Sequence, residues 1–131
     1  MKIAVITDDG KTISQHFGRA GFYKVITIDN EKVVQEEMRE KVGHNHFSDE
    51  HHENHHHESH GLTDEHHHRH MQMADVISDC QVVICGGMGM GAYESMRRLY
   101  ITPVVTDKTD IMTAVQDFMT GKLIDHTEKL H

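Results

Sequence analysis

Three hydrophobic patterns in the first third of the chain predict three β-strands. Lys2–Thr7 is an almost wholly apolar run that ends at the turn-forming sequence Asp8-Asp9-Gly10, as expected of a buried, central strand. Phe22–Asp29 alternates, so its apolar residues face both sides of a sheet. Lys32–Glu40 alternates more weakly after the tight turn Asn30-Glu31. The last two runs therefore predict a hairpin whose outer strand has one face in solvent.

Further along the chain, helical and strand patterns take turns. Met71–Asp79 has apolar residues at helical spacing, and Gln81–Cys85 is a short apolar run that suits a strand buried on both faces. Ile101–Thr106 is the last predicted strand. Pro103 within it favours an edge position or a strand start, because proline cannot donate to a sheet.

Two more helices are expected after the apolar run that ends at Cys85. The first spans residues 91–100, with its inward side chains at Met96, Leu99 and Tyr100. The second is capped by Asp107 or Thr109 and ends at Gly121. Its apolar residues follow the spacing i, i+3, i+4, i+7 and are Ile111, Ala114, Val115 and Phe118.

This order of elements predicts an α/β fold, with residues 1–131 forming a single domain. The sheet would be mixed and five-stranded, because the first half reads as a hairpin and the second half as parallel strands joined by helical crossovers. Helices would flank the sheet.

The composition changes sharply in a histidine-rich tract at residues 43–70. From His44 to His70 there are twelve histidines, six acidic residues and one arginine, and the apolar residues are only Phe47 and Leu62. Such a segment cannot bury enough surface to offset its ordering entropy, so we expect it to be disordered without metal. It interrupts the domain as an inserted loop.

Charge and composition exclude several classes of function. The chain has 131 residues, 13 Lys and Arg against 21 Asp and Glu, and a net charge of −8, which disfavours nucleic acid as a partner. No apolar run approaches the roughly 20 residues of a membrane span, and the N-terminus does not resemble a signal peptide. We therefore expect a cytoplasmic protein in a reducing compartment.

The two cysteines fit a reducing compartment. Cys80 and Cys85 bracket one strand at an odd separation, so we expect their side chains on opposite faces and no disulfide between them. The chain has no CxxC pair and no cysteine quartet, which a self-sufficient iron–sulfur protein needs.

A glycine loop follows the apolar run that ends at Cys85, at Gly86-Gly87-Met88-Gly89-Met90-Gly91. A buried strand, a glycine-rich loop and a helix start form a typical ligand site in open α/β sheets, so this loop is predicted to form one wall of a binding site. Its exposed N–H groups would cradle an anion, either a cluster or a phosphate. The alternative is a tight turn with close packing. The glycine spacing is not that of the dinucleotide fingerprint.

Two motifs and a closing sequence together resemble the dinitrogenase iron–molybdenum cofactor biosynthesis family. They are Ile13-Ser14-Gln15-His16-Phe17-Gly18-Arg19-Ala20, Val83 to Ala92, and Gly121-Lys122-Leu123. The resemblance covers residues 1–42 and 71–125, and the histidine-rich tract departs from it. It implies a ribonuclease-H-like α/β domain that binds or carries metal–sulfur clusters, with His16 as a cluster ligand beside the glycine loop.

The candidate ligands differ in how specific they are. An imidazole at His16 suits iron, copper, zinc and molybdenum-bearing clusters alike. Met88 and Met90 are soft donors, but flexible apolar cover over a dry pocket is the favoured interpretation. For Cys85, a small buried hydrophobic residue is the favoured interpretation, and a thiolate ligand is the alternative. Few strong ligands favour a transient carrier over a redox centre.

The histidine-rich tract has a metal-binding composition of its own, with many alternative ligand sets and no zinc-finger pattern. Its candidate ligands are His51, His52, His55, His56, His57, His60, His66, His67, His68 and His70. Labile sites for nickel, zinc, copper or cobalt are expected, either to supply a site at His16 or to store metal. A solvated linker is the alternative.

These features lead to three hypotheses for function. The first is a carrier of an iron–molybdenum-type metal–sulfur cluster, which has cluster donor and acceptor proteins as partners. The second is a histidine-rich metallochaperone or store for divalent ions, and the third is a regulatory domain that binds a nucleotide or phosphate. Catalysis is not expected, because Asp8 and Asp9 have no partner carboxylate near the second buried strand and no nucleophile elbow is present.

Overall fold

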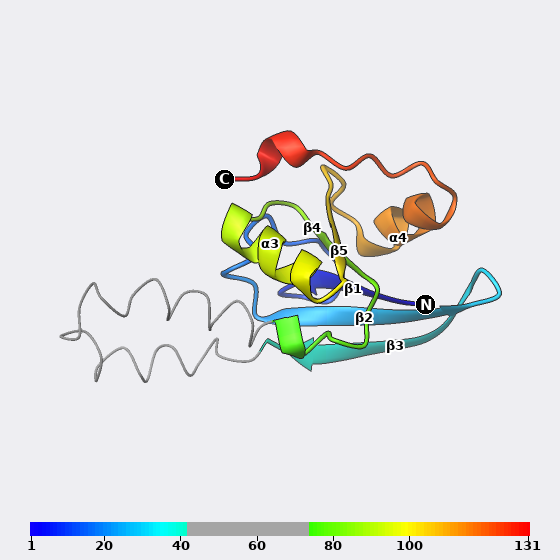
Figure 1. Ribbon diagram of the computed structural model, residues 1–131. Helices are drawn as coiled ribbons and strands as arrows, with labels where there is room; N and C mark the ends of the chain where they lie inside the picture. Colours follow the sequence, from blue (N-terminus) through cyan, green and yellow to red (C-terminus); the bar gives the residue numbers. More distant parts are fainter. Residues whose placement is uncertain (42–73) are drawn as a thin grey trace.

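The computed structural model describes residues 1–41 and 74–131, and its centre is a five-stranded mixed sheet (Figure 1). The strands are β1 (Lys2–Thr7), β2 (Phe22–Asp29), β3 (Lys32–Glu40), β4 (Val82–Cys85) and β5 (Thr102–Val105). Their order across the sheet is β3-β2-β1-β4-β5. The pairs β1–β2 and β2–β3 are antiparallel, whereas β1–β4 and β4–β5 are parallel. The predicted α/β fold, with a hairpin half and a parallel half, is confirmed.

Helices cover the two faces of the sheet separately. Helix α3 (Met90–Arg98) packs its Met96 into a core that contains Ala4 and Ile6 of β1. Helix α4 (Ile111–Met119) packs against the other face, whose core contains Ile3 and Val5. Successive residues of a strand point to opposite faces, so β1 supplies both cores and is the central strand that its apolar run predicted. A short 3₁₀ helix, η1 (Thr127–Lys129), follows α4.

The hairpin between β2 and β3 turns without glycine. Asn30 and Glu31 both have positive φ, of 51° and 64°, and Asp29 pairs with Lys32. Two positive φ values in a two-residue loop match the right-handed twist of the flanking strands. The outer strand β3 forms one edge of the sheet, and β5, with Pro103, forms the other.

The structure corrects two details of the helix predictions. Tyr100 does not point inward: α3 ends at Arg98, Tyr100 has a φ of 62°, and its side chain is 91% exposed. The left-handed conformation turns the chain away from the helix axis and carries the ring into solvent. The N-cap of α4 is Asp110 and not Asp107 or Thr109, because the Asp110 carboxylate accepts from the Thr113 N–H at 2.9 Å.

The prediction for the cysteines was half wrong. Both thiols are free, as expected, but Cys80 and Cys85 contribute to the same core and not to opposite faces. The parity argument fails because β4 begins at Val82, so Cys80 lies in the preceding turn and is outside the alternation of the strand.

Some predicted segments fall on residues outside the described ranges. The histidine-rich tract at 43–70 is among them, with all ten of its candidate ligands, and so is the start of the helix expected over Met71–Asp79. In its described part only Ala74 and Asp75 are helical. The N–H groups of Ile77 and Ser78 bond three residues back, so the chain leaves the helix in tight turns. Among the described helices, none is long and apolar enough to cross a membrane.

Candidate functional site

Two loops meet at the end of the sheet where the parallel strands β1 and β4 finish. The first, which we call the His16 loop, comprises residues 13–20 and precedes β2. The second is the glycine loop, residues 86–91, which leads into α3. Carboxyl ends of parallel strands are the usual ligand-binding edge of an open α/β sheet.

Main-chain hydrogen bonds hold the His16 loop to the sheet and to the segment that precedes α4. The Ile13 N–H donates to Thr109 O at 2.8 Å, and the Ser14 N–H donates to Ile6 O at 2.9 Å. The side chain of Ile13 is buried in the core beneath α4. The loop is therefore a fixed part of the fold.

The two loops are in direct contact. The Gly86 N–H donates to Ser14 O at 2.9 Å, and the Phe17 N–H donates to Gly87 O at 3.2 Å. A Cβ atom at Gly86 would lie 2.9 Å from Ser14 O, and one at Gly87 would lie 2.5 Å from Gln15 O. Glycine is required at both positions, because any side chain would displace the main chain next to His16.

His16 is exposed, and hydrogen bonds hold its main chain in place. Its N–H donates to Ser14 Oγ at 3.1 Å. Its carbonyl accepts from the N–H groups of Arg19 and Ala20, both at 3.1 Å. The residue itself is exposed. The imidazole is thus presented to solvent from an anchored turn, beside the glycine loop.

Some N–H groups of the glycine loop already bond to oxygens of the chain. The Gly86 N–H is used by Ser14 O, and the Met90 N–H, at the start of α3, donates to the main-chain oxygen of His131 at 3.0 Å. These bonds engage two of the loop's six N–H groups within the chain, as the alternative of a close-packed turn predicts.

The sulfur atoms of the site differ in their exposure. Met88 is 1% exposed and belongs to the core under α3, whereas Met90 is 48% exposed. Cys85 is fully buried, and burial raises the pKa of its thiol to about 12. A neutral, buried thiol is a packing group and not a thiolate ligand. Of these three, only Met90 has its side chain at the surface.

The structure adds a residue that the pattern of the sequence did not single out. Lys41 follows the last residue of β3, and its side chain is 1% exposed. Its ammonium donates to Phe17 O in the His16 loop and lies 4.3 Å from the centroid of the Phe17 ring. A lysine after a polar edge strand is normally solvated. This one is buried against Phe17 of the His16 loop and Tyr23 of β2.

The structure gathers only part of the predicted metal-ligand set. Residues 1–41 and 74–131 contain no group of three or more His, Cys, Asp or Glu side chains able to hold a metal ion. Of the predicted metal-binding histidines, His16 alone lies in the described part of the chain. A cluster held here would therefore have few protein ligands.

The fold is similar to that of several solved structures. The protein PH0822 is 27% identical, with 96% of each chain covered and a TM-score of 0.68. The apo form of the orange protein from Desulfovibrio gigas is 19% identical, with 93% of this chain and 89% of that chain covered and a TM-score of 0.65. A protein provisionally described as a dinitrogenase, from Methanocaldococcus jannaschii, is 17% identical, with 94% and 91% covered and a TM-score of 0.64. The last two likenesses show the fold alone.

Sequence comparison places the chain in a family. A search of curated proteins finds no match. In contrast, the sequence profile described as dinitrogenase iron-molybdenum cofactor matches residues 1–121, and this range contains both motifs that meet in the structure, the His16 loop and the glycine loop. The chain therefore belongs to the dinitrogenase iron–molybdenum cofactor family.

Proposed function

We propose that this chain binds a metal–sulfur cluster of the iron–molybdenum type and carries it between a donor and an acceptor protein, without turnover of its own. The observation that carries the proposal is the direct contact of the His16 loop with the glycine loop at the carboxyl edge of the parallel strands. Membership of the dinitrogenase iron–molybdenum cofactor family supports the choice of cargo.

The chemistry of the site suits a carrier. His16 would supply one bond to the cluster from an exposed position, and Met90 is an exposed soft donor on the glycine loop. Cys85 is buried and neutral. A cluster held by one imidazole and by packing is released more easily than one held by a set of thiolates. Easy release is what a carrier needs and what a redox protein must avoid.

The test is an anaerobic titration of the full chain with isolated iron–molybdenum cofactor, followed by visible absorbance. His16→Ala is expected to weaken binding by about tenfold or more, since it removes the proposed bond. His126→Ala is the matched control, because His126 is held by Glu128 and Asp107 on another segment. Equal affinity of wild type and His16→Ala would remove this role. Failure of the wild type to bind would overturn the proposed function.

A second function rests on a different observation, the composition of the histidine-rich tract. We propose that this tract binds divalent nickel, zinc, copper or cobalt in labile sites, because imidazole at this density is a metal-binding composition. Calorimetric titration with nickel chloride compares the full chain with a variant in which a short glycine–serine linker replaces residues 43–70. Equal stoichiometry in the two proteins would refute the role of the tract.

The nucleotide or phosphate hypothesis receives less support from the site. It needs free N–H groups in the glycine loop, and those of Gly86 and Met90 already donate to oxygens of the chain. A thermal-shift screen with nucleotides and inorganic phosphate tests it, and a shift that depends on ligand concentration would restore it.

A further inference from the structure

Lys41 is a buried cation at the base of the candidate site. It is the one charged side chain that is fully buried among residues 1–41 and 74–131. Its main-chain N–H donates to Gly21 O at 3.0 Å, which ties the end of β3 to the start of β2. The side chain then runs inward beneath the His16 loop to Phe17 O. Hydrogen bonds of the main chain and of the side chain therefore hold the ammonium in place.

The surroundings of this ammonium do not neutralise it. Two aromatic faces border it, with ring centroids 4.3 Å away at Phe17 and 5.8 Å away at Tyr23. In the described ranges no carboxylate forms an ion pair with it. Asp8 acts on it only at longer range, as does the buried thiol of Cys85. Aromatic rings and one carbonyl stabilise a cation without cancelling its charge.

The ammonium is coupled to both loops of the site through one residue. Phe17 O accepts from Lys41, and the Phe17 N–H donates to Gly87 O at 3.2 Å. Phe17 directly follows His16. The positive charge therefore contacts the residue that follows His16, at the place where the His16 loop bonds to the glycine loop.

We propose that Lys41 is an electrostatic positioning residue of this site, and that its buried charge makes the site select anionic metal–sulfur cargo over free divalent cations. The inference rests on the proposed function. Metal–sulfur clusters of this type are anionic, and a fixed cation in a site of low dielectric attracts an anion more strongly than an exposed lysine does. The same charge repels nickel or zinc ions from His16. Lys41 acts through space and through Phe17, so we class it as a positioning residue.

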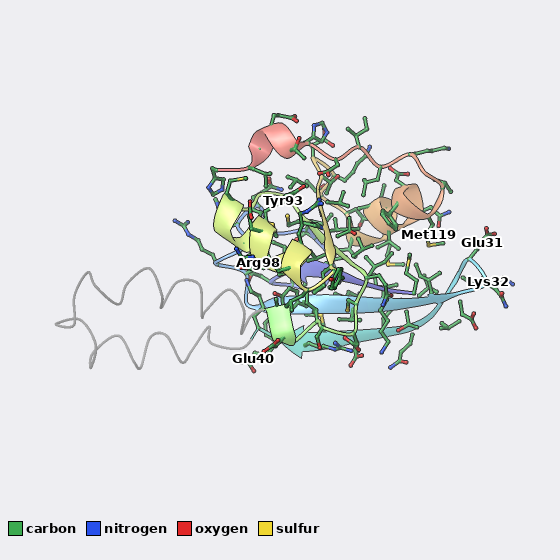
Figure 2. All side chains as sticks on the ribbon, in the orientation of Figure 1. Glu31, Lys32, Glu40, Tyr93, Arg98 and Met119 are labelled. Carbon is green, nitrogen blue, oxygen red and sulfur yellow. The ribbon has the colours of Figure 1, made fainter. Side chains whose placement is uncertain are left out.

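The test extends the cofactor titration to two variants of Lys41. Lys41→Met removes the charge and the donor, whereas Lys41→Gln removes the charge but keeps an N–H donor for Phe17 O. Each is expected to raise the Kd for isolated iron–molybdenum cofactor by about tenfold. Lys32→Met is the matched control: it makes the same change in net charge at an exposed position, at the far end of β3 from Glu40 (Figure 2). Its Kd is expected to equal that of the wild type.

A variant with the opposite expected effect on affinity tests the inference even if the Lys41 variants do not fold. Asp8→Asn removes the carboxylate that acts on Lys41. The amide oxygen of the new side chain can still accept from the Gly21 N–H, which in the wild type donates to Asp8 Oδ1 at 2.9 Å. Because this carboxylate raises the pKa of Lys41, the titration is made at pH 6, well below the Lys41 pKa of about 8, where the ammonium keeps its charge. The variant is then expected to lower the Kd by about twofold, because less negative charge opposes Lys41.

The outcomes separate the inference from the proposed function. Wild-type affinity in Lys41→Gln, with weakening only in Lys41→Met, would overturn the inference in favour of a structural hydrogen bond. Unchanged affinity in both, while His16→Ala binds weakly, would overturn the inference and leave the carrier function standing. Unchanged or weaker binding by Asp8→Asn would also count against it. No binding by the wild type would overturn both.

Discussion

The burial of Lys41 has a cost in stability that follows from its charge. Burial lowers the pKa of its ammonium from 10.5 to about 8, and the Asp8 carboxylate and the Cys85 thiol only partly oppose this effect. The charged form is thus less favourable in the folded chain than in the unfolded chain. Strain and unfavourable burial of this kind are concentrated at functional sites.

Lys41→Met is therefore expected to be more stable than the wild type at pH 7, by about 2 kcal/mol, because it removes the cost of burying a charge but also loses one hydrogen bond. The folded pKa lies below the unfolded one, so the cost is fully present below pH 8 and disappears as pH rises towards 10.5. The difference in unfolding free energy between the two proteins should shrink across this window. Denaturant unfolding at pH 7, 8, 9 and 10 measures it.

Taking the difference between the two proteins cancels the titration of groups that do not act on Lys41, including that of Cys80, whose pKa is raised. Lys32→Met, at an exposed position, should show no such trend. A Lys41→Met protein less stable than the wild type at pH 7 would mean that the contacts of the ammonium with Phe17 outweigh its desolvation.

At the scale of elements, the two helices end in the same motif with different residues. After α3 the Ile101 N–H bonds to Met96 O and the Tyr100 N–H to Arg97 O; after α4 the Lys122 N–H bonds to Asp117 O and the Gly121 N–H to Phe118 O. This is the Schellman arrangement, which needs a positive φ at the residue after the C-cap. Gly121 has a φ of 76° at that place, but at the end of α3 it is Tyr100, with a φ of 62°.

Tyr100→Gly is expected to stabilise the chain by about 0.5–1 kcal/mol, because glycine adopts the left-handed conformation without strain. The greater conformational entropy of glycine in the unfolded chain offsets only part of this stabilisation. The tyrosine ring is 91% exposed, so little packing is lost. Gly121→Ala should destabilise by about 1 kcal/mol through backbone strain alone, since no atom lies within 4 Å of the added Cβ. Thermal and denaturant unfolding measure both.

Gly18→Ala is the control, because an added Cβ there also meets nothing within 4 Å and its φ is not in the left-handed region. It should be neutral or slightly stabilising. Loss of stability in Tyr100→Gly would show that the exposed ring makes contacts that offset its backbone strain.

At the scale of the whole molecule, segments far apart in the chain converge on the carboxyl edge of the parallel strands. The C-terminal segment returns to this edge above α3 (Figure 1). The His131 N–H donates to Met88 O at 3.1 Å, and His131 O accepts from Met90. Leu130 packs on the core beneath α3. These residues follow the range of the family match, 1–121, and they cover the glycine loop.

Removal of residues 125–131 is expected to lower the unfolding free energy by about 2–3 kcal/mol, because it exposes part of the buried Met88 side chain and leaves the loop's hydrogen bonds unmade. The amide of Met90 should also exchange with solvent faster, since its acceptor is lost. Hydrogen exchange and denaturant unfolding measure the two effects. His131→Ala, which keeps the main chain, should leave both nearly unchanged; a large effect of that substitution would contradict this account.

The sequence by itself determined the strands, the hairpin, the parallel half and the contact-forming loops. Apolar runs such as Lys2–Thr7 can be buried in few ways, and the glycines at 86 and 87 indicated a close approach that the structure shows to be with Gln15. Composition singles out the histidine-rich tract, and the His-Phe-Gly motif, through the family resemblance, predicts a ligand at residue 16; both stay predictions.

Only the tertiary structure decided which groups are buried, paired or exposed. Lys41 lies after a polar strand and is buried by a loop more than twenty residues away in the chain, and Cys80 joins the face of Cys85 because it precedes the strand. Tyr100 points outward because the end of α3 is set by bonds to Met96 and Arg97. Hydrophobic periodicity is a local property, but the desolvation of a charge depends on every segment packed around it, and that packing exists only in the folded chain.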